Sequence, residues 1–337
     1  MIEGVIWALV AGVMLGLYAL PEKYVKDYKY ENTWGLFFLI ALVLLPLMSA
    51  VMLVDNIGYI ISSIDNKTLI SMALLSIVWG VGVQLWSKAI DYIGVSLGFS
   101  IFIGSVIIVG SLLPFLYDGL PEGNVLFYII IGLLIILIGV FCKGFAGILR
   151  EGKIEQGNAS FESEKSSKMI KGIAIAFFGG IMATGFSLAN TMGIGQISKL
   201  SLEAGNPEWS SAVVVMIIIY MCGAIYVVPY FTYHLFKNNS WHYFATPKLL
   251  PNLGLITVMG VFNFAASVIF AYAAYNLGEA GNSVGYAIYN TASVVFAVVG
   301  GLLAKEWVGA PQKSRYLLHT ALGCMVIGVL LIAYSNG

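Results

Sequence analysis

Charged residues are scarce in this sequence, and their scarcity excludes a water-soluble fold. Of the 337 residues, 10% are charged and 59% are hydrophobic, whereas soluble domains carry about 25% charged and about 45–50% apolar residues. A soluble globule of this composition would expose contiguous apolar patches larger than the few hundred Å² that soluble monomers tolerate. The sequence therefore predicts a membrane protein and excludes a soluble enzyme.

Cysteine and nucleotide-binding motifs are also few or missing. Cys142, Cys222 and Cys324 all fall inside apolar runs, and none has the CxxC or Cys/His spacing of a metal or redox site. The chain has no GxxxxGK(S/T) phosphate loop and no glycine-rich dinucleotide fingerprint after a strand. We therefore expect no cofactor, no metal site and no ATP-driven pump. The first apolar run follows Met1-Ile2-Glu3 without a basic segment, which favours a retained helix over a cleaved signal peptide.

Long apolar runs dominate what remains. A bilayer core about 30 Å thick requires about 20 consecutive apolar residues per helix. By this criterion the sequence predicts ten membrane spans, near residues 3–20, 33–54, 68–92, 95–116, 124–146, 171–193, 209–236, 249–277, 281–304 and 316–335.

One connector, residues 149–168, is long and polar, and it has too little apolar surface to fold by itself. It divides the chain into residues 1–148 and 169–337, with five predicted spans each. A related glycine pattern occurs in both halves, Gly94 to Gly110 in the first and Gly278 to Gly300 in the second. Because five is odd, a second half with the same internal order lies upside down in the membrane, as in secondary transporters. We predict an all-α polytopic membrane protein of ten transmembrane helices, built as two inverted five-helix repeats.

The positive charges are unevenly distributed between the two sets of connectors. Lys and Arg number 17 in total, as do Asp and Glu, so no basic surplus points to a nucleic-acid partner. Fifteen of the 17 lie after odd-numbered spans or close to their ends, and only Lys67 and Lys199 lie on the opposite side. Cytoplasmic loops are enriched in Lys and Arg. We therefore predict an integral protein of the inner membrane with both termini on the non-cytoplasmic side.

Several short motifs resemble one transporter family. The run Pro21-Glu22-Lys23-Tyr24-Val25-Lys26, with the following Tyr28, Tyr30, Glu31 and Trp34, resembles the end of the first span in the L-rhamnose/proton symporter family of the drug/metabolite transporter superfamily. Further similarities are Trp79-Gly80-Val81-Gly82 with Tyr92-Ile93-Gly94, Ile107-Ile108-Val109-Gly110 and Lys305-Glu306-Trp307. The resemblance implies that spans one to four and six to nine surround a central cavity, and that the family's activity is sugar uptake coupled to proton entry. Enteric members carry two asparagines where this chain has Val83 and Leu85, which leaves the particular sugar open.

A carrier for a neutral polar solute requires hydrogen-bonding side chains and aromatic faces inside its cavity. In the ninth span, Asn282, Tyr286, Tyr289, Asn290 and Ser293 share one helical stripe, which indicates either a solute site or a polar seam between helices. The third and eighth spans add polar and aromatic residues at positions where the superfamily lines its cavity. The predicted solute-binding residues are Trp79, Gln84, Trp86, Asn263, Tyr286, Tyr289 and Asn290. Asn190 precedes Gly193 and Gly195, a pattern that favours a helix-end turn.

Proton coupling requires an ionisable group whose access changes, and charged groups within the membrane are functional candidates. Lys88 and Asp91 are three residues apart and share one helical face. We predict them, with Glu279 between the eighth and ninth spans, as proton-coupling residues, although a surface ion pair would produce the same spacing. Glu22 and Glu31 flank the first polar loop and are typical of solvated loop charges.

The sequence thus predicts a secondary transporter, not an enzyme, that imports a small neutral sugar with protons by alternating access. One alternative is an exporter of amphipathic metabolites, whose cavity would be lined mainly by Phe, Tyr and Met. Another is a membrane sugar sensor that does not transport. The expected partners are the sugar, protons and the lipid bilayer, and the sequence leaves open whether the chain forms a homo-oligomer.

Overall fold

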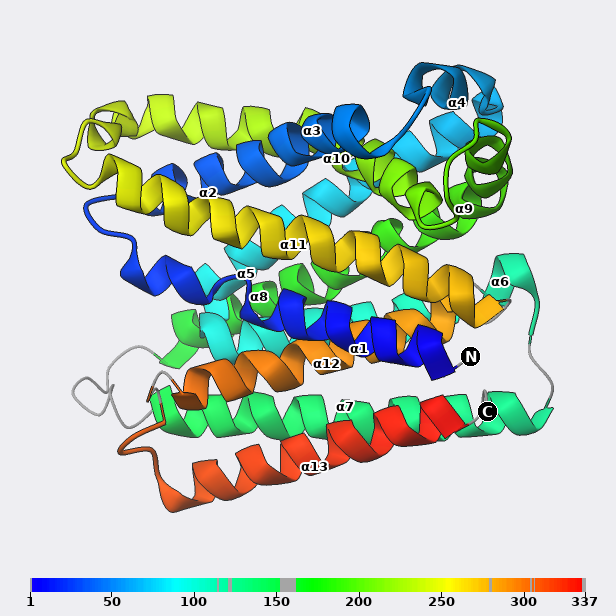
Figure 1. Ribbon diagram of the computed structural model, residues 1–337. Helices are drawn as coiled ribbons and strands as arrows, with labels where there is room; N and C mark the ends of the chain where they lie inside the picture. The colour runs from blue at the N-terminus through cyan, green and yellow to red at the C-terminus, as the bar shows by residue number, and fades with distance from the viewer. Residues whose placement is uncertain are drawn as a thin grey trace.

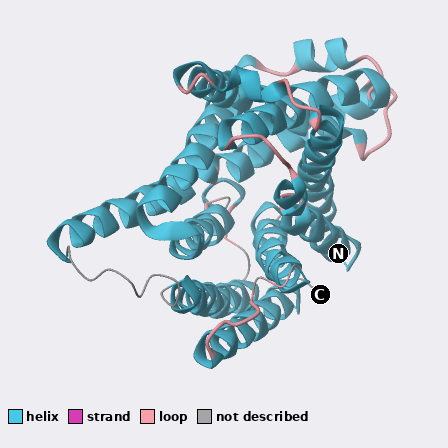
Figure 2. Cartoon of the chain, turned by 90° about the vertical axis from the view of Figure 1, so that its left-hand side faces the viewer, coloured by secondary structure: helices cyan, strands magenta, loops and turns pink. Residues whose placement is uncertain are grey.

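The computed structural model describes residues 2–113, 115–120, 123–151, 162–278, 281–303, 305 and 307–334. Within these ranges the regular structure is entirely helical (Figures 1 and 2). A helix satisfies all its backbone hydrogen bonds internally, which is what a segment in the apolar core of a bilayer requires. The predicted all-helical class is therefore confirmed.

The described residues form helices and short helical turns. In chain order they are α1 (Ile2–Leu17), the 3₁₀ turn η1 (Leu20–Tyr24), α2 (Tyr30–Leu39), the π-helical turn η2 (Ile40–Leu44), α3 (Leu45–Leu53), α4 (Ile57–Ser63), α5 (Asn66–Leu112), α6 (Phe115–Asp118), α7 (Gly123–Glu151), α8 (Glu162–Ala183), α9 (Gly185–Glu203), α10 (Ser210–Lys237), the 3₁₀ turn η3 (Ser240–Phe244), α11 (Leu249–Leu277), α12 (Gly281–Leu303) and α13 (Gln312–Tyr334).

Nine helical segments among the described residues are long and apolar enough to cross a membrane. They are Ile2–Tyr24, Tyr30–Leu53, Asn66–Ala89, Gly123–Arg150, Met169–Glu203, Ser210–Lys237, Leu249–Leu277, Gly281–Leu303 and Gln312–Tyr334, and a shorter apolar helix covers Leu97–Leu112. Nine of the ten predicted spans each overlap one of the nine long segments, and the predicted span 95–116 overlaps only the shorter helix Leu97–Leu112. The chain is therefore a polytopic membrane protein.

Helix α5 reverses direction between Ala89 and Leu97, although its backbone stays helical. The ring of Trp86 lies 6.1 Å from that of Phe99 and 6.0 Å from that of Phe102, measured between centroids. In a straight helix, residues 86 and 102 would lie about 24 Å apart. The two parts of α5 therefore run antiparallel, at the place where the sequence predicted two spans joined by a short turn.

Two of the membrane segments are interrupted near mid-length. Met169–Glu203 breaks at Thr184, where α8 ends and α9 begins, and the Thr184 hydroxyl donates to the Ile181 carbonyl at 2.6 Å. In Tyr30–Leu53, the π-helical turn η2 ends just before Pro46. Proline has no N–H, and its ring displaces the carbonyl four residues earlier, which explains the local widening.

Glycines set the closest helix contacts. A β-carbon at Gly12 of α1 would lie 2.4 Å from Cβ of Ala292 on α12. A β-carbon at Gly82 of α5 would lie 2.5 Å from the Ala183 nitrogen on α8, and one at Gly132 of α7 would lie 2.5 Å from Ile332 on α13. Small residues allow membrane helices to approach backbone to backbone and gain van der Waals contact. Figure 1 shows the resulting pair α7 and α13 side by side along one edge of the molecule.

We predict that Gly12→Leu destabilises the bundle, because the larger side chain has to displace α12. Overpacking costs typically about 1–3 kcal/mol. Size-exclusion chromatography of the detergent-solubilised protein after heating should show a lower midpoint for Gly12→Leu. The matched control is Gly195→Leu on α9, where a β-carbon meets nothing within 4 Å; equal midpoints for the two variants would contradict the packing argument.

Candidate solute-binding cavity

A central cavity of about 320 Å³ lies between the helices that the sequence predicted around it. Ligand sites typically measure about 300–1,000 Å³, so the space suits a small solute. The described lining residues come from α1 and the turn after it, α2, η2, α5, α8, α9, α10, α11 and α12, and none of them comes from α7 or α13. They are Leu15, Gly16, Tyr18, Ala19, Phe37, Phe38, Leu42, Trp79, Val83, Trp86, Phe99, Phe102, Ile103, Val106, Ala183, Phe186, Tyr220, Asn263, Ser267, Tyr286, Tyr289, Asn290, Ser293 and Ala297.

The polar lining residues are concentrated on α10, α11 and α12. We call Tyr220, Asn263, Ser267, Tyr289 and Asn290 the polar wall. The residues that α2, η2 and the second part of α5 contribute are aliphatic or phenylalanine. The cavity thus offers hydrogen bonds from one set of helices and apolar contact from another.

Hydrogen bonds hold the polar wall in place. The Tyr220 hydroxyl donates to Asn263 Oδ1 at 3.0 Å and lies 2.6 Å from Ser267 Oγ. Ser267 Oγ lies 3.4 Å from the Tyr289 hydroxyl, and Asn290 Nδ2 donates to the Tyr286 carbonyl at 2.9 Å. Buried polar groups are costly unless they are paired, so these bonds fix the side-chain positions.

The lining contains no Asp, Glu, Lys, Arg or His among the described residues. Trp86 also lines the cavity, and its buried Nε1 has no partner in the described part of the chain. Such a cavity suits an uncharged solute that forms hydrogen bonds.

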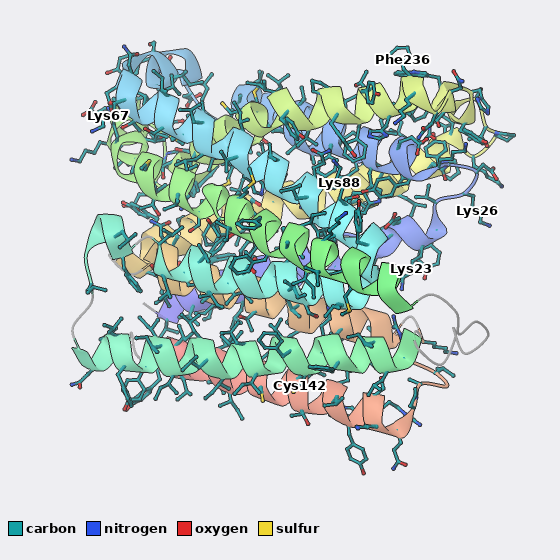
Figure 3. The ribbon with its side chains drawn as sticks, turned by 180° about the vertical axis from the view of Figure 1, so that it is seen from behind. Lys23, Lys26, Lys67, Lys88, Cys142 and Phe236 are labelled. Atoms are coloured by element: carbon teal, nitrogen blue, oxygen red, sulfur yellow. The ribbon has the colours of Figure 1, made fainter. Side chains whose placement is uncertain are left out.

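The cavity opens toward one end of the molecule. Ala297, close to the end of α12, lines the cavity and is exposed, whereas Tyr220, Ser267 and Tyr286 are each at most 3% exposed. Lys23, Lys26 and Lys88 lie toward this open end, and Lys67 lies at the opposite end (Figure 3).

The opposite end is closed by contacts between α5, α9 and α12. A β-carbon at Gly110 would lie 2.3 Å from the Tyr286 ring. Asn190 Nδ2 donates to Asn282 Oδ1 at 2.5 Å, and Asn190 is fully buried. Asn190 lies in the interior of α9, so the predicted helix-end role is wrong: the helix continues through Gly193 and Gly195 to Glu203.

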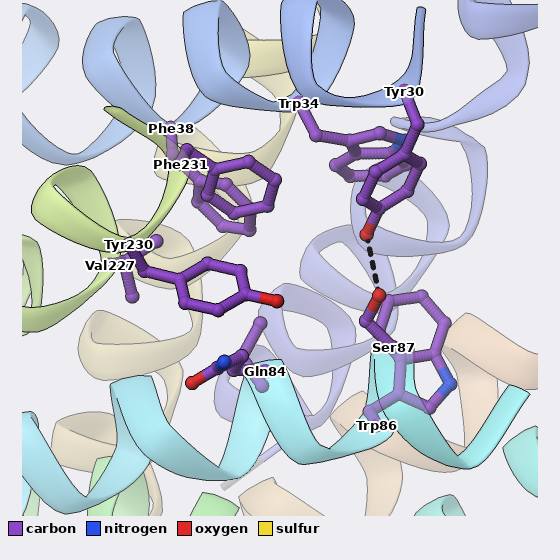
Figure 4. A pocket seen from close by; sticks show the side chains of 10 residues that line it. Tyr30, Trp34, Phe38, Gln84, Trp86, Ser87, Val227, Tyr230 and Phe231 are labelled. Atoms are coloured by element: carbon purple, nitrogen blue, oxygen red, sulfur yellow. Dashed lines mark hydrogen bonds between the residues drawn. The ribbon is translucent and has the colours of Figure 1, made fainter. Parts of the chain in front are cut away.

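A second pocket of about 20 Å³, roughly the space of one water molecule, lies between α2, α5 and α10 (Figure 4). We call it the inner pocket. The Tyr30 hydroxyl lies 2.8 Å from Ser87 Oγ across it. Gln84 lines this inner pocket and accepts a hydrogen bond from Tyr226. Phe38, Val83 and Trp86 line both spaces, so the inner pocket adjoins the central cavity.

Six of the seven predicted solute-binding residues, Trp79, Trp86, Asn263, Tyr286, Tyr289 and Asn290, line the central cavity, and Gln84 lies outside it. Their role in binding stays a prediction.

The predicted coupling residues lie elsewhere. Lys88 is exposed near the end of the first part of α5. The side chain of Asp91 and the whole of Glu279 lie outside the described residues.

Two acids have surroundings that the sequence did not reveal. Glu22 accepts a 2.7 Å hydrogen bond from Trp34 Nε1, and Trp34 lines the inner pocket. Glu31 is 7% exposed, accepts from Asn238 Nδ2 at 3.0 Å and accepts from the Ser240 hydroxyl. Glu31 is therefore not a solvated loop charge but a buried link between α2 and the connection from α10 to α11.

Comparison with known proteins supplies the family. The family described as L-rhamnose-proton symport protein (RhaT) matches residues 1–335. The chain belongs to this family. L-rhamnose-proton symporters of Yersinia pestis (strain Pestoides F) and Yersinia pseudotuberculosis (strain YPIII) are each 26% identical to it over 342 residues, covering 97% of this chain and 95% of the relative. The expected family resemblance is thus confirmed.

We predict that, in the conformation described, the cavity admits reagents from its open end. In a background without the three native cysteines, Ala297→Cys should react with a membrane-impermeant maleimide from the side of Lys23 and Lys88. Asn282→Cys, buried in the closed end, should react from neither side. Lys67→Cys should react from the side opposite Lys23 and Lys88, which we call the far side, and it serves as the control for access from there. Faster labelling of Ala297→Cys from the far side would contradict the orientation of the cavity.

Proposed function

We propose that this chain imports a small neutral sugar together with protons by alternating access. The observation that carries the proposal is the central cavity, which has a hydrogen-bonded polar wall and no formally charged lining residue among those described. A neutral polyol can form hydrogen bonds to Asn263, Asn290 and Tyr289 while the indoles of Trp79 and Trp86 cover its C–H surfaces.

The family supports both the substrate class and the coupling ion. The Yersinia relatives are named L-rhamnose-proton symporters, and their similarity covers nearly the whole of both chains. At 26% identity, we transfer the class, a rhamnose-like sugar with protons, and leave the individual sugar to experiment.

We propose ten membrane crossings arranged as two inverted repeats, residues 1–148 and 169–337, joined by the connector 149–168. The packing supports a two-fold relationship: α1 packs on α11 and α12, and α8, its counterpart in the second half, packs on α5. The remaining counterparts pack on each other, with α7 against α13 and α10 against α2 and α3. Inverted repeats allow one cavity to open to either side by rocking of the halves.

We also propose that the open end of the cavity faces the cytoplasm. Both termini lie together at the other end of the molecule (Figure 1), and the lysine-rich connectors lie at the open end. The positive-inside rule then places both termini outside the cytoplasm of an inner-membrane protein, and the structure corresponds to an inward-facing state.

For coupling we propose Lys88, Asp91 and Glu279, and we add Glu22. The carboxylate of Glu22 is hydrogen-bonded to Trp34, so a change in its protonation acts directly on a side chain of the inner pocket.

An exporter of amphipathic metabolites is the second candidate, because five phenylalanines line the cavity: Phe37, Phe38, Phe99, Phe102 and Phe186. The asparagines of the polar wall favour the sugar. No methionine is among the described lining residues, in contrast to the lining expected for an exporter.

We predict gradient-stimulated accumulation of one sugar by proteoliposomes. The test panel contains labelled hexoses, 6-deoxyhexoses and pentoses, assayed with and without an inward proton gradient. If no sugar enters under any gradient while amphipathic compounds leave the vesicles, the exporter hypothesis replaces the symporter.

We predict that removing a coupling residue separates accumulation from exchange. Asp91→Asn, Glu22→Gln or Lys88→Gln at a true coupling position should abolish gradient-driven accumulation, because no proton binds, and should retain counterflow of labelled for unlabelled sugar. Lys67→Gln, an exposed residue at the far end, is the control and should retain both. If a variant loses both accumulation and counterflow, or retains both, the substituted residue is not a coupling residue.

A further inference from the structure

The two asparagines of the cavity are held by opposite ends of their amides. Asn263 is held by its oxygen, because the Tyr220 hydroxyl donates to Oδ1 at 3.0 Å. Asn290 is held by its nitrogen, because Nδ2 donates to the Tyr286 carbonyl at 2.9 Å. Both residues line the central cavity. The amide group that remains free to bind the solute is therefore the N–H donor of Asn263 and the carbonyl acceptor of Asn290.

Tyr220 is well placed to enforce this polarity. It lies on α10, is 1% exposed, and its ring packs 5.3 Å from that of Trp79 and 5.2 Å from that of Phe264, centroid to centroid. Its hydroxyl also lies 2.6 Å from Ser267 Oγ, one turn along α11 from Asn263. A ring packed between aromatic neighbours keeps its hydroxyl at one point, and the Asn263 amide presents Oδ1 to that hydroxyl.

We propose that Tyr220 is a positioning residue that fixes the Asn263 amide, so that the cavity recognises two solute hydroxyls, one as a hydrogen-bond acceptor and the other as a hydrogen-bond donor. One hydroxyl accepts a hydrogen bond from Asn263 Nδ2, and another donates to Asn290 Oδ1. This inference rests on the proposed sugar transport and specifies its chemistry. A hydroxyl fulfils either role, whereas an ammonium group cannot accept from Asn263 and a carboxylate cannot donate to Asn290. A polyol therefore satisfies both positions with the same kind of group.

Monodeoxy and monofluoro analogues of the transported sugar distinguish the two roles, because fluorine keeps weak acceptor character and cannot donate. In competition against the labelled parent sugar, removal of a hydroxyl at either reading position should weaken affinity about fivefold or more, from the loss of one hydrogen bond. At the position that Asn263 reads, the fluoro analogue should recover part of the loss. At the position that Asn290 reads, the deoxy and fluoro analogues should be equally weak.

Tyr220→Phe retains the ring and removes only the hydroxyl. We expect KM for the parent sugar to rise about fivefold with Vmax within about twofold of wild type, and the advantage of the fluoro analogue to disappear. In the Asn263→Ala background, Tyr220→Phe should cause no further rise in KM, because the residue acts through Asn263. Tyr233→Phe, on the exposed side of the same helix, is the matched control and should leave KM unchanged.

The outcomes separate the two proposals. If wild type accumulates no sugar, the proposed function fails and this inference fails with it. If wild type accumulates a sugar and Tyr220→Phe changes neither KM nor the analogue pattern, only the inference is overturned. Should Tyr220→Phe not fold, Asn290→Asp, which keeps an acceptor oxygen, should bind the sugar more tightly than Asn263→Asp, which loses the donor; the reverse order would overturn the inference.

Discussion

The close approach of helix backbones at glycine is the contact on which the arrangement of the bundle depends. Inside a bilayer, apolar side chains gain little by leaving lipid for protein, so helices associate through tight van der Waals packing and a few polar contacts. Gly12, Gly82 and Gly132 each allow one helix to lie against the backbone or the β-carbon of another. These contacts place α1 on α12, α8 on α5 and α13 on α7, and the cavity is the space that the packed helices leave between them.

The polar groups inside this space are confined because each needs a partner. Tyr220, Asn263 and Ser267 satisfy one another across α10 and α11, whereas the second part of α5 presents only apolar side chains to the cavity. The interruptions at Thr184 and Pro46 lie in the segments that supply Ala183, Phe186 and Leu42 to the lining. Both interruptions therefore occur in segments that line the cavity.

Much of this architecture follows from the sequence because a membrane helix needs a long apolar run, and such runs are visible without a structure. Helical spacing also identified Tyr286, Tyr289 and Asn290 as one stripe, since residues three and four apart share a face. The partners across helices were not predictable. Tyr226 donates a hydrogen bond to Gln84, which lines the inner pocket. Asn238 and Ser240 donate to Glu31, and Asn190 donates to Asn282. Each of these depends on which residue of a distant segment lies opposite, and the spacing of residues along the chain does not reveal that pairing.

The uncharged lining of the central cavity has an electrical consequence. A neutral polyol and a cavity without formally charged residues among those described move no net charge when they reorient. In a proton-coupled carrier of this design, the membrane potential therefore acts on the proton and its carrier group, at about 2.3 kcal/mol per charge for each 100 mV. Return of the empty carrier is electrically silent unless that group is ionised at the time. The voltage dependence of transport would then report where in the cycle the proton is carried, independently of which sugar travels with it.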